Sequence, residues 1–388
     1  MSKNTICPLP WTGISMNPHG RIRACGRSKP NVNAPSLKSS TIEESWNSDY
    51  YSKLRLDMLA GVKNSNCENC YKQEQLGGTS KRQELLERYA VSEDQLIKST
   101  DVYGHVTNMP EIIDIRVGNV CNLKCVHCWT GNSSKWYEDK NLLDKYENTT
   151  KYAIDNSWID SSSHVWQYLR DNIKNITTVN VLGGEPFASK QHNQFIDWCI
   201  ATDNTHIELH YVTNATLLTP EMVVKLSKFR ALDLGISIDD IGSRSELLRF
   251  PNKWADIDNI LTYINGLNLQ QVFFNWTCYN LNIRRLGYTI DYCRTHFPNI
   301  AFKLSDYVTS PAHMSAQNLP PEYKDRVARE LVGYPEAQFY VNFMFEDNLW
   351  EEYHKVLFNY LEDLDRARKT DWKKVLPEIA ELYKDLND

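Results

Sequence analysis

The chain has 388 residues, of which 41% are hydrophobic and 24% are charged, and its formal net charge at pH 7 is −6. This size predicts one large domain with additions, or two domains with full cores. The acidic balance argues against a general nucleic-acid-binding surface, and no run approaches the roughly eighteen apolar residues of a membrane span. Because the first residues lack an apolar signal region, we expect a cytoplasmic protein with reduced thiols and no membrane partner.

Residues 1–90 predict a small cysteine-rich module. They carry four of the ten cysteines, several glycine, proline and asparagine turns, and a helical stretch over residues 80–89. Residues 91–110 are polar and rich in turn-forming residues, which predicts a linker.

From residue 111 to residue 310, short apolar segments alternate with longer amphipathic ones. The predicted strands are residues 112–117, 178–182, 207–213, 232–238, 272–278 and 301–307. The predicted helices between them are residues 163–173, 190–201, 219–229, 254–267 and 283–295, and Ser163 and Thr219 are suitable N-caps. Strands that alternate with helices are typical of βα units on a parallel sheet. The six predicted strands therefore indicate the α/β fold class and a partial (β/α)6 barrel rather than a complete eightfold one.

Two further segments complete the predicted organisation. Residues 137–162 are rich in asparagine and aspartate and show little periodicity, so their length predicts an inserted lid or a flexible connection. Residues 311–388 predict a helical extension, with helices over 322–331 and 349–368 and a last piece after Asp371. Apolar residues at offsets of three and four give residues 349–368 one apolar face, which we expect to dock on the main body.

The most informative motif is Cys121-Asn-Leu-Lys-Cys125-Val-His-Cys128, which follows the first predicted strand of the barrel. Three thiolates on one tight loop can hold three irons of a [4Fe–4S] cube and leave the fourth iron without a protein ligand. Two alternatives stay open at this stage, namely three zinc ligands awaiting a fourth and buried structural cysteines. The scattered cysteines, which we expect to pack in the core, are Cys199, Cys278 and Cys293.

Ligands of parallel α/β folds lie at the carboxyl ends of the strands, so the residues that end each strand are candidates. The second strand ends in Gly-Gly-Glu-Pro, where glycines let the backbone approach a ligand and the glutamate suits an ammonium group. The third ends in Thr-Asn-Ala-Thr, and the fourth in Ser-Ile-Asp-Asp before a polar loop. Each motif taken alone is also an ordinary turn or helix cap. These candidates are Gly183, Gly184, Glu185, Thr213, Asn214, Ser237, Asp239 and Arg249.

The CNLKCVHC loop, the GGEP turn, and the TNAT and SIDD strand ends, in this order, resemble the radical S-adenosylmethionine (SAM) enzymes. The family pattern is CxxxCxΦC with an aromatic residue before the last cysteine, and His127 fills that place. The resemblance covers residues 111–310 and implies a [4Fe–4S] cluster whose open iron binds the amino and carboxylate groups of SAM. Reduction would then cleave the sulfonium and give a 5′-deoxyadenosyl radical that takes a hydrogen atom from the substrate.

By motif match, the resemblance implies a role for each candidate. The implied ligands of the SAM-binding cluster, and so the catalytic residues, are Cys121, Cys125 and Cys128. The implied binding residues for the methionine ammonium are Gly183, Gly184 and Glu185, and those near the remaining parts of SAM are His127, Thr213, Asn214, Ser237, Asp239 and Arg249.

Cys7, Cys25, Cys67 and Cys70 form a second cysteine group. A CxxC pair with two distant cysteines suits a zinc site with four thiolate ligands as well as an iron–sulfur cluster, and the spacing alone does not separate them. The surrounding segments CPLPW, ESWNS and CENCY resemble the twitch module, a short relative of the SPASM module that holds an auxiliary [4Fe–4S] cluster in radical SAM enzymes. The resemblance implies these four cysteines as ligands, with Gly26 where many relatives have a second cysteine.

Four thiolates would leave no open iron on the auxiliary cluster, so it would accept or relay an electron rather than bind substrate. This favours a net oxidation, in which hydrogen abstraction is followed by loss of the substrate radical's electron. We expect a flavodoxin or ferredoxin as the electron donor. In the barrel, Asp114 and Arg116 with Lys303 or Asp306 would form either a polar interior for a polar substrate or a satisfied internal ion pair.

Three function classes follow from these features. The first, which we adopt, is an oxidative radical SAM enzyme that modifies a small polar molecule such as a sugar or cyclitol. The second is a radical maturase that acts on a peptide, for which the sequence shows no clear peptide-binding segment. The third is a non-catalytic iron–sulfur or zinc protein, which would not produce 5′-deoxyadenosine.

Overall fold

The structure of the chain is a computed structural model that describes residues 5–29, 31–146, 156–160, 163–267, 269 and 271–385. The chain divides into two compact units. The first consists of residues 1–119, 154–211 and 228–231, and the second of residues 120–153, 212–227 and 232–388. None of the helices in the described part of the chain has both the length and the hydropathy that crossing a bilayer requires.

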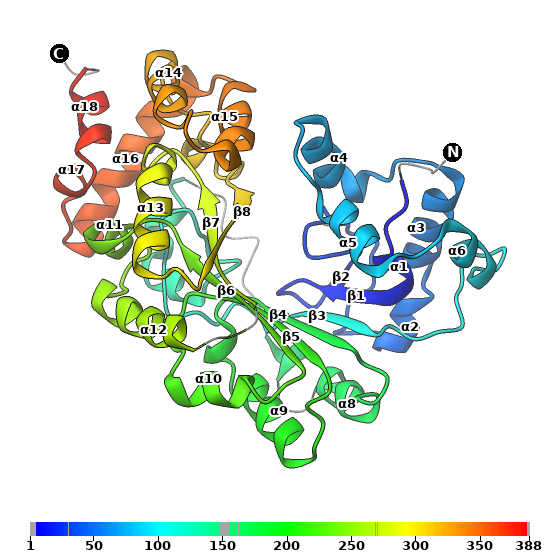
Figure 1. Cartoon of the computed structure of the whole chain (residues 1–388). Helices are drawn as coiled ribbons and strands as arrows, with labels where there is room; N and C mark the ends of the chain where they lie inside the picture. Colours follow the sequence, from blue (N-terminus) through cyan, green and yellow to red (C-terminus); the bar gives the residue numbers. More distant parts are fainter. Residues whose placement is uncertain are drawn as a thin grey trace. The chain divides into compact units, whose positions relative to one another are not determined.

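The first unit is built on a mixed sheet that begins with a hairpin-like pair (Figure 1). Its strands are β1 (Gly13–Met16), β2 (Ile22–Arg23), β3 (Ile112–Arg116), β4 (Thr178–Leu182) and β5 (Glu208–Thr213), in the order β2-β1-β3-β4-β5. Strand β1 is antiparallel to β2 but parallel to β3, and β3, β4 and β5 are parallel. The amino-terminal module therefore contributes strands to the same sheet as the first predicted barrel strands.

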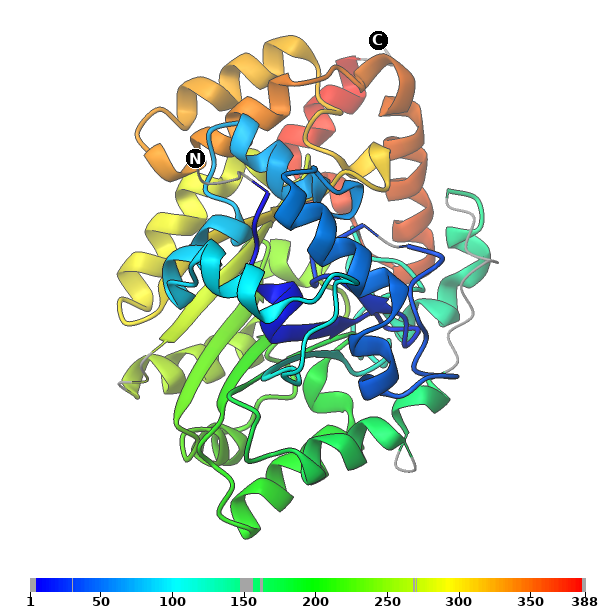
Figure 2. The same cartoon turned by 90° about the vertical axis from the view of Figure 1, so that its right-hand side faces the viewer.

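Figure 2 shows the helices of the first unit in blue, cyan and green, and several of them begin at a capping residue. They are α1 (Leu9–Thr12), α2 (Ile42–Trp46), α3 (Asp49–Ala60), α4 (Glu68–Gln75), α5 (Lys81–Tyr89), α6 (Glu93–Ser99), α8 (His164–Asp171) and α9 (Lys190–Ala201). Thr41, Ser80 and Ser92 each form a capping box that starts the following helix. Helix α6 lies within the predicted linker 91–110, and its Leu96 is buried.

A buried arginine connects several segments of the amino-terminal module. Arg55 on α3 has no exposed side-chain surface. Its guanidinium donates to the carbonyl oxygens of Pro10, Trp46 and Gly104 at 2.7, 2.9 and 3.0 Å, and to Asn47 Oδ1 at 2.8 Å. These bonds satisfy most of its donors and so offset part of the desolvation cost, although burial still lowers the pKa of Arg55 to about 10.

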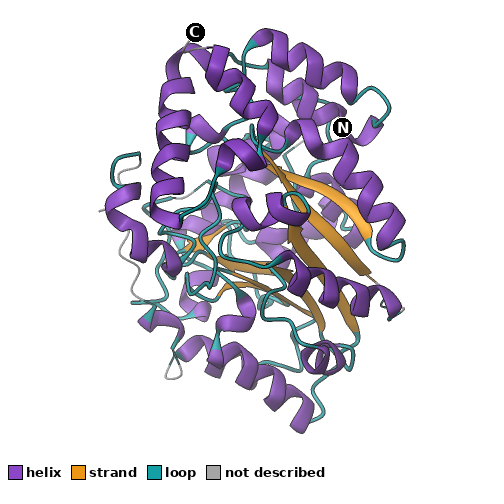
Figure 3. Cartoon of the chain, turned by 90° about the vertical axis from the view of Figure 1, so that its left-hand side faces the viewer, coloured by secondary structure: helices purple, strands orange, loops and turns teal. Residues whose placement is uncertain are grey.

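The second unit continues the βα alternation and ends in a series of helices (Figure 3). Its strands β6 (Ala231–Ile238), β7 (Gln271–Cys278) and β8 (Ala301–Tyr307) are parallel and adjacent in this order. The helices α7 (Lys140–Leu143) and α10 (Pro220–Leu226) precede β6 in the chain. Between the strands lie α11 (Gly242–Leu248), α12 (Trp254–Gly266) and α13 (Leu286–His296). Those of the extension are α14 (Pro321–Glu330), α15 (Gln338–Phe345), α16 (Trp350–Arg368), α17 (Trp372–Val375) and α18 (Pro377–Asp385).

The α/β fold class and the helical carboxyl terminus are confirmed. All six predicted strands exist, with bounds that differ by at most one residue. Ser163 and Thr219 cap α8 and α10 through their hydroxyl oxygens, as predicted. The predicted polar loop between Asp239 and Arg249 is wrong, because most of it is the helix α11.

The predicted lid over residues 137–162 lies partly outside the described residues, which omit 147–155 and 161–162. The described parts contain the end of a 3-10 helix (Ser134–Asp139), α7 and a second 3-10 helix (Ser157–Ile159). The proposed domain boundaries at residues 90, 110 and 310 stay predictions.

Acid should destabilise the first unit through His192. This ring has no exposed surface, contacts Tyr211 Oη through Nε2 at 2.8 Å and Asn193 Oδ1 through Nδ1 at 3.0 Å, and burial lowers its pKa to about 4. The unfolded chain gains this proton near pH 6.5 but the folded chain only near 4, so stability falls as the pH falls between these values. We expect a loss of roughly 3 kcal/mol.

Denaturant unfolding followed between pH 7 and pH 4 measures this loss. In His192→Gln the slope of stability against pH should be shallower over that range. The matched control His296→Gln, at an exposed position, should keep the wild-type slope. A wild-type slope in His192→Gln would contradict the prediction.

Candidate active site

The loop that carries Cys121, Cys125 and Cys128 is held by the end of α11. The backbone N–H groups of Lys124 and Val126 donate to the carbonyl oxygens of Phe250 and Leu248 at 2.7 and 2.8 Å. The last carbonyls of a helix have no intrahelical partner, so they are free to accept such bonds. The N–H of Cys128 donates to the carbonyl oxygen of Cys125 at 3.0 Å, and this bond closes a turn. The helix that the sequence did not predict thus fixes the backbone between the first and third thiols.

The three thiols of this loop act on one another electrostatically. Burial raises the pKa of Cys125 to about 12, and Cys121 adds to this effect. Burial raises the pKa of Cys128 well above its usual value, with further contributions from Cys125 and Cys121. Such thiols deprotonate when a metal supplies positive charge, since metal binding and proton release are coupled. The donor set therefore fits a metal cluster better than three unrelated core cysteines.

The TNAT segment lies beside the first cysteine. Asn214 Nδ2 donates to Asn122 Oδ1 at 3.0 Å and lies 3.9 Å from Cys121 Sγ. Asn122 Nδ2 donates in turn to Thr216 Oγ1 at 2.7 Å. Thr213 Oγ1 accepts the N–H of residue 215 at 3.0 Å, so the segment is also a side-chain-stabilised turn. The structure thus brings one predicted site residue, Asn214, into contact with the cysteine loop, while the printed bond of Thr213 lies within the TNAT turn.

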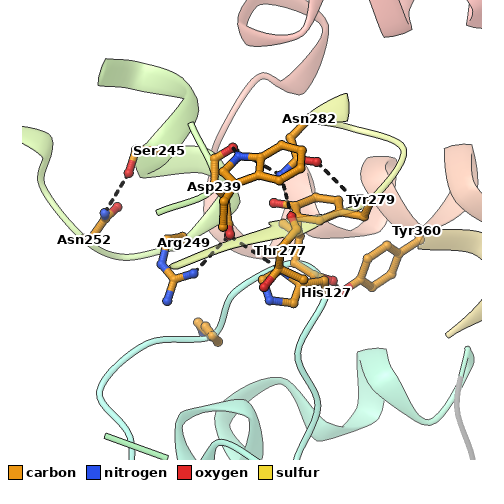
Figure 4. A network of polar contacts seen from close by, with 12 residues as sticks. His127, Asp239, Ser245, Arg249, Asn252, Thr277, Tyr279, Asn282 and Tyr360 are labelled. Carbon is orange, nitrogen blue, oxygen red and sulfur yellow. Dashed lines mark hydrogen bonds and ion pairs between the residues drawn. The ribbon is translucent and has the colours of Figure 1, made fainter. Parts of the chain in front are cut away.

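A buried ionic network lies around His127 (Figure 4). Arg249 Nη1 donates to Asp239 Oδ2 at 3.1 Å, and His127 Nδ1 lies 3.6 Å from the same oxygen. The carbonyl oxygen of Asp239 accepts from Trp276 Nε1 at 3.1 Å and from Asn282 Nδ2 at 3.2 Å. The end of β7 and its following turn therefore fix the backbone at the end of β6.

The charges in this network favour a cation beside the cysteine loop. Burial acts to lower the pKa of Arg249, but Cys125 and Asp239 raise it above its ordinary value. Burial lowers the pKa of His127, against the opposing effect of Asp239. The His127 ring packs on the ring of Tyr279 with centroids 4.9 Å apart. His127, which fills the aromatic position of the family pattern, therefore packs against an aromatic ring that follows β7.

The GGEP turn belongs to the first unit and is described within it. A Cβ atom at Gly183, whose φ is +142°, would lie 2.9 Å from the carbonyl oxygen of Gly118, and Gly184 N–H donates to that oxygen at 3.1 Å. The two glycines thus let the ends of β3 and β4 approach each other. Glu185 is buried, and its Oε1 accepts the N–H of Phe187 at 3.2 Å, so this carboxylate also caps a short helix.

The four amino-terminal cysteines line one cavity within the first unit. Cys67 is the N-cap of α4 and Cys70 lies in its first turn, while Cys7 precedes α1 and Cys25 follows β2. Burial raises the pKa of Cys67 to about 12, and Cys25 and Cys70 raise it further. Arg82 lines the same cavity and donates to the carbonyl oxygen of Ile6 at 3.1 Å.

These two cysteine groups pass a test of fit for clusters. Seven thiols fall into one set of three and one set of four. Thiols of the same set raise the pKa of Cys7 and Cys67 in one set and of Cys125 and Cys128 in the other. In the described part of the chain, no group of three or more cysteine, histidine or acidic side chains is placed so that it could hold a metal ion. Because the thiols gather in these two sets, we propose Cys121, Cys125 and Cys128, and separately Cys7, Cys25, Cys67 and Cys70, as cluster ligands.

Several residues that contribute to the site were missed by sequence reasoning. Tyr279 and Asn282 follow β7, and the rule of strand ends could have found them. Tyr360 and Arg368 come from α16, far along the chain, and no local motif connects them with the cysteine loop. Ser237 lies half-buried on β6 two residues before Asp239, without contributing to the network in Figure 4.

Comparison with known proteins assigns the family. The model of the radical SAM superfamily matches residues 115–293, which contain the cysteine triplet. A model of the iron–sulfur cluster-binding SPASM domain matches residues 7–71, which contain all four amino-terminal cysteines. The chain therefore carries a radical SAM domain and an amino-terminal SPASM-type iron–sulfur domain. Its cofactors are accordingly SAM, a [4Fe–4S] cluster and an auxiliary iron–sulfur cluster.

Curated relatives of the enzyme match over part of their length. This chain is 30% identical, over 149 residues or 38% of its length, to the uncharacterized protein MJ0907 of Methanocaldococcus jannaschii. It is 28% identical over 33% of this chain to the mycofactocin maturase MftC of Mycolicibacterium smegmatis. It is 24% identical over 55% of this chain to the radical SAM cyclopropyl synthase TigE of Paramaledivibacter caminithermalis. The matched stretches span 44%, 26% and 43% of those proteins, which is less than half of each.

Replacement of one proposed ligand tests the assignment of the triplet. Cys125→Ala should remove about four irons per chain, because two remaining thiolates hold a cube poorly. It should also abolish 5′-deoxyadenosine formation. The control Cys293→Ala changes a buried cysteine of α13 outside both sets and should keep wild-type iron. Iron and sulfide assays on anaerobically reconstituted protein provide the measurement. Full iron in Cys125→Ala would contradict the assignment.

Proposed function

We propose that the enzyme oxidises a small polar molecule by radical SAM chemistry, with the auxiliary cluster as electron acceptor. When bound, the SAM-binding cluster supplies one electron that splits SAM into methionine and a 5′-deoxyadenosyl radical. A hydrogen atom of the substrate would complete 5′-deoxyadenosine, and the substrate would then lose a proton and one electron. The four-thiolate auxiliary cluster supplies an acceptor for that electron. We also propose a flavodoxin or ferredoxin as the donor of the first electron and a cytoplasmic location.

The observation that supports a polar substrate is a row of buried and half-buried polar side chains in the first unit. Strand register places Ser15 opposite both Arg23 and Asp114, so these residues share one face of β2, β1 and β3. Arg116 lies two residues after Asp114 on the same face. In the described residues, Ser15 Oγ, Arg23 Nε, Asp114 Oδ1 and Arg116 Nε are buried and have no hydrogen-bond partner.

Unpartnered polar atoms on this scale are costly unless a ligand or water satisfies them. The alternative, an internal ion pair of Asp114 and Arg116 with Lys303 or Asp306, would leave the row without a ligand to bind. Burial, and then the neighbouring charge of Arg116, lowers the pKa of Arg23. Two guanidinium groups and one carboxylate suit a molecule that carries hydroxyl groups and an anionic group.

This polar row borders the amino-terminal cysteine group. Arg116 Nη2 donates to the carbonyl oxygen of Gly26 at 3.2 Å. A Cβ atom at Gly26 would lie 3.0 Å from Asp114 Oδ2 and 3.3 Å from Arg116 Nη2. Gly26 directly follows the proposed ligand Cys25. A molecule bound at the row would therefore lie next to the group to which it loses an electron.

A radical maturase that acts on a peptide is the second candidate. It is favoured by the similarity of residues in this chain to MftC, which is named a maturase. The two candidates differ in the size of the substrate. A cell extract separated by ultrafiltration offers both classes to the enzyme.

Anaerobic, reconstituted enzyme with dithionite and SAM should form 5′-deoxyadenosine, because the triplet leaves one iron open. The filtrate of the extract, which holds small metabolites, should increase this formation, and Asp114→Asn should reduce the increase but keep the basal rate. Mass spectrometry of the mixture measures both. An increase with the retained peptide fraction alone would favour the maturase. No product at full iron content would refute both functions.

The auxiliary cluster is tested by the double variant Cys67→Ala/Cys70→Ala. It should lose about four irons per chain but keep basal SAM cleavage, because the triplet is unchanged. Substrate oxidation should be lost, since the electron has no acceptor. The control Cys199→Ala, at a buried position of α9, should keep both iron and turnover. Full iron and full turnover in the double variant would rule out the electron-acceptor role.

A further inference from the structure

The carboxyl-terminal helix α16 makes direct contact with the cysteine loop. Tyr360 Oη donates to the carbonyl oxygen of Val126 at 2.8 Å, and Arg368 Nη2 donates to that of Lys124 at 2.6 Å. The N–H groups of Lys124 and Val126 are already held by the end of α11. Both residues that flank Cys125 are therefore bonded through their N–H and through their carbonyl. Figure 4 shows Tyr360 on the side of His127.

Arg368 is a buried cation without a carboxylate partner in the part of the chain that the structure describes. Its side chain lies between the rings of Trp136 and Phe250, with its guanidinium carbon 4.8 and 5.0 Å from their centroids. Its Nη2 donates to the carbonyl oxygen of Lys124, whereas its Nε and Nη1 are buried and have no partner among the described residues. A buried charge in this state is expensive, and natural proteins usually supply an opposite charge.

Two carboxylates, Asp139 and Asp365, act on Arg368 electrostatically, and each has a partner of its own. Asp139 Oδ2 lies 2.6 Å from Lys124 Nζ, and Asp365 accepts from Thr370 Oγ1 at 2.6 Å and from the N–H of Trp372 at 2.8 Å. The group that Arg368 contacts directly is the cysteine loop, through the Lys124 carbonyl one residue before Cys125. A cation held at this place suits the negative charge of a cluster bound to the loop.

We propose that Arg368 is the counter-cation of the SAM-binding cluster and that α16 is part of the structure that holds this cluster. The inference rests on the proposed ligands Cys121, Cys125 and Cys128. A cluster with three thiolates is anionic, and it gains one more negative charge on reduction. A fixed cation therefore stabilises the reduced state and raises the midpoint potential, which eases electron transfer from the donor. Arg368 is a positioning residue, since it acts on the cofactor through the loop and through its charge.

The midpoint potential of the reconstituted cluster tests this inference without measuring turnover. The experiment uses the Cys67→Ala/Cys70→Ala background, so that only the triplet cluster gives a signal. Arg368→Met should move the midpoint to a more negative potential in a redox titration monitored by electron paramagnetic resonance. The matched control Arg366→Met removes the same charge from the same helix at a side chain that is 71% exposed, and should leave the midpoint unchanged. A wild-type midpoint in Arg368→Met at full iron content would overturn the inference.

A conservative variant separates charge from packing. Arg368→Lys keeps the charge and should restore iron content and midpoint toward wild type, even where Arg368→Met takes up little iron. Equal failure of both variants would overturn the electrostatic role in favour of a purely structural one. Tyr360→Phe removes the bond to Val126 but no charge, and should speed iron loss to a chelator with little change in midpoint. If the background protein itself held no cluster, the ligand assignment would fail, and with it the proposed function.

Discussion

The parallel pairing of β1 with β3 is the constraint on which the rest of the first unit depends. Gly13, Ile14 and Ser15 pair with Ile112, Ile113 and Asp114, so the amino-terminal module joins the sheet in register. A Cβ atom at Gly13 would lie 3.1 Å from both the Cβ and the carbonyl oxygen of Ile112, which explains the small residue at the start of this contact. The module is therefore an extension of the sheet and not a tethered appendage.

This pairing has consequences for both cysteine groups. Leu9, Leu85 and Ile112 form one buried cluster, and Cys7 and Cys25 pack against it. The same strand, β3, leads within a few residues to the triplet loop. A substitution that weakened the β1–β3 contact would thus disturb the auxiliary thiols and the polar row through a single element. The chemistry of the molecule depends on backbone hydrogen bonds that contain none of its reactive atoms.

Sequence reasoning recovered what depends on local pattern and missed what depends on tertiary contacts. The strands followed from runs of apolar residues, and the caps Ser163 and Thr219 from side-chain chemistry that acts within three residues. Helix α11 was missed because its sequence, GSRSELL, begins with small polar residues and shows no clear apolar period. Its Arg244 is instead held by ion pairs with Asp240 and with Glu378 of α18.

The site was recovered in the same uneven way. The cysteine spacing predicted the triplet, and the strand ends and the segment after β6 predicted Asn214, Asp239 and Arg249; the structure places Asn214 beside the loop and pairs Asp239 with Arg249, while their roles stay predictions. The contact of Arg368 with the loop joins residues 244 positions apart, and only folding brings them together. The unpartnered atoms of the polar row were equally invisible, because a sequence shows which groups are polar and not which are satisfied.

The contacts of α16 with the cysteine loop also bear on the order in which the chain is synthesised and loaded with iron. A ribosome releases the triplet long before it reaches Tyr360 and Arg368, which lie 234 and 244 residues beyond their loop partners. Until then, the two carbonyl groups flanking Cys125 lack their donors, and the nascent loop lacks the charge of Arg368. Iron delivered to an unfinished chain would meet a cysteine loop that lacks its bonds from Tyr360 and Arg368. The cell's iron–sulfur carriers would best load this protein after translation has passed α16.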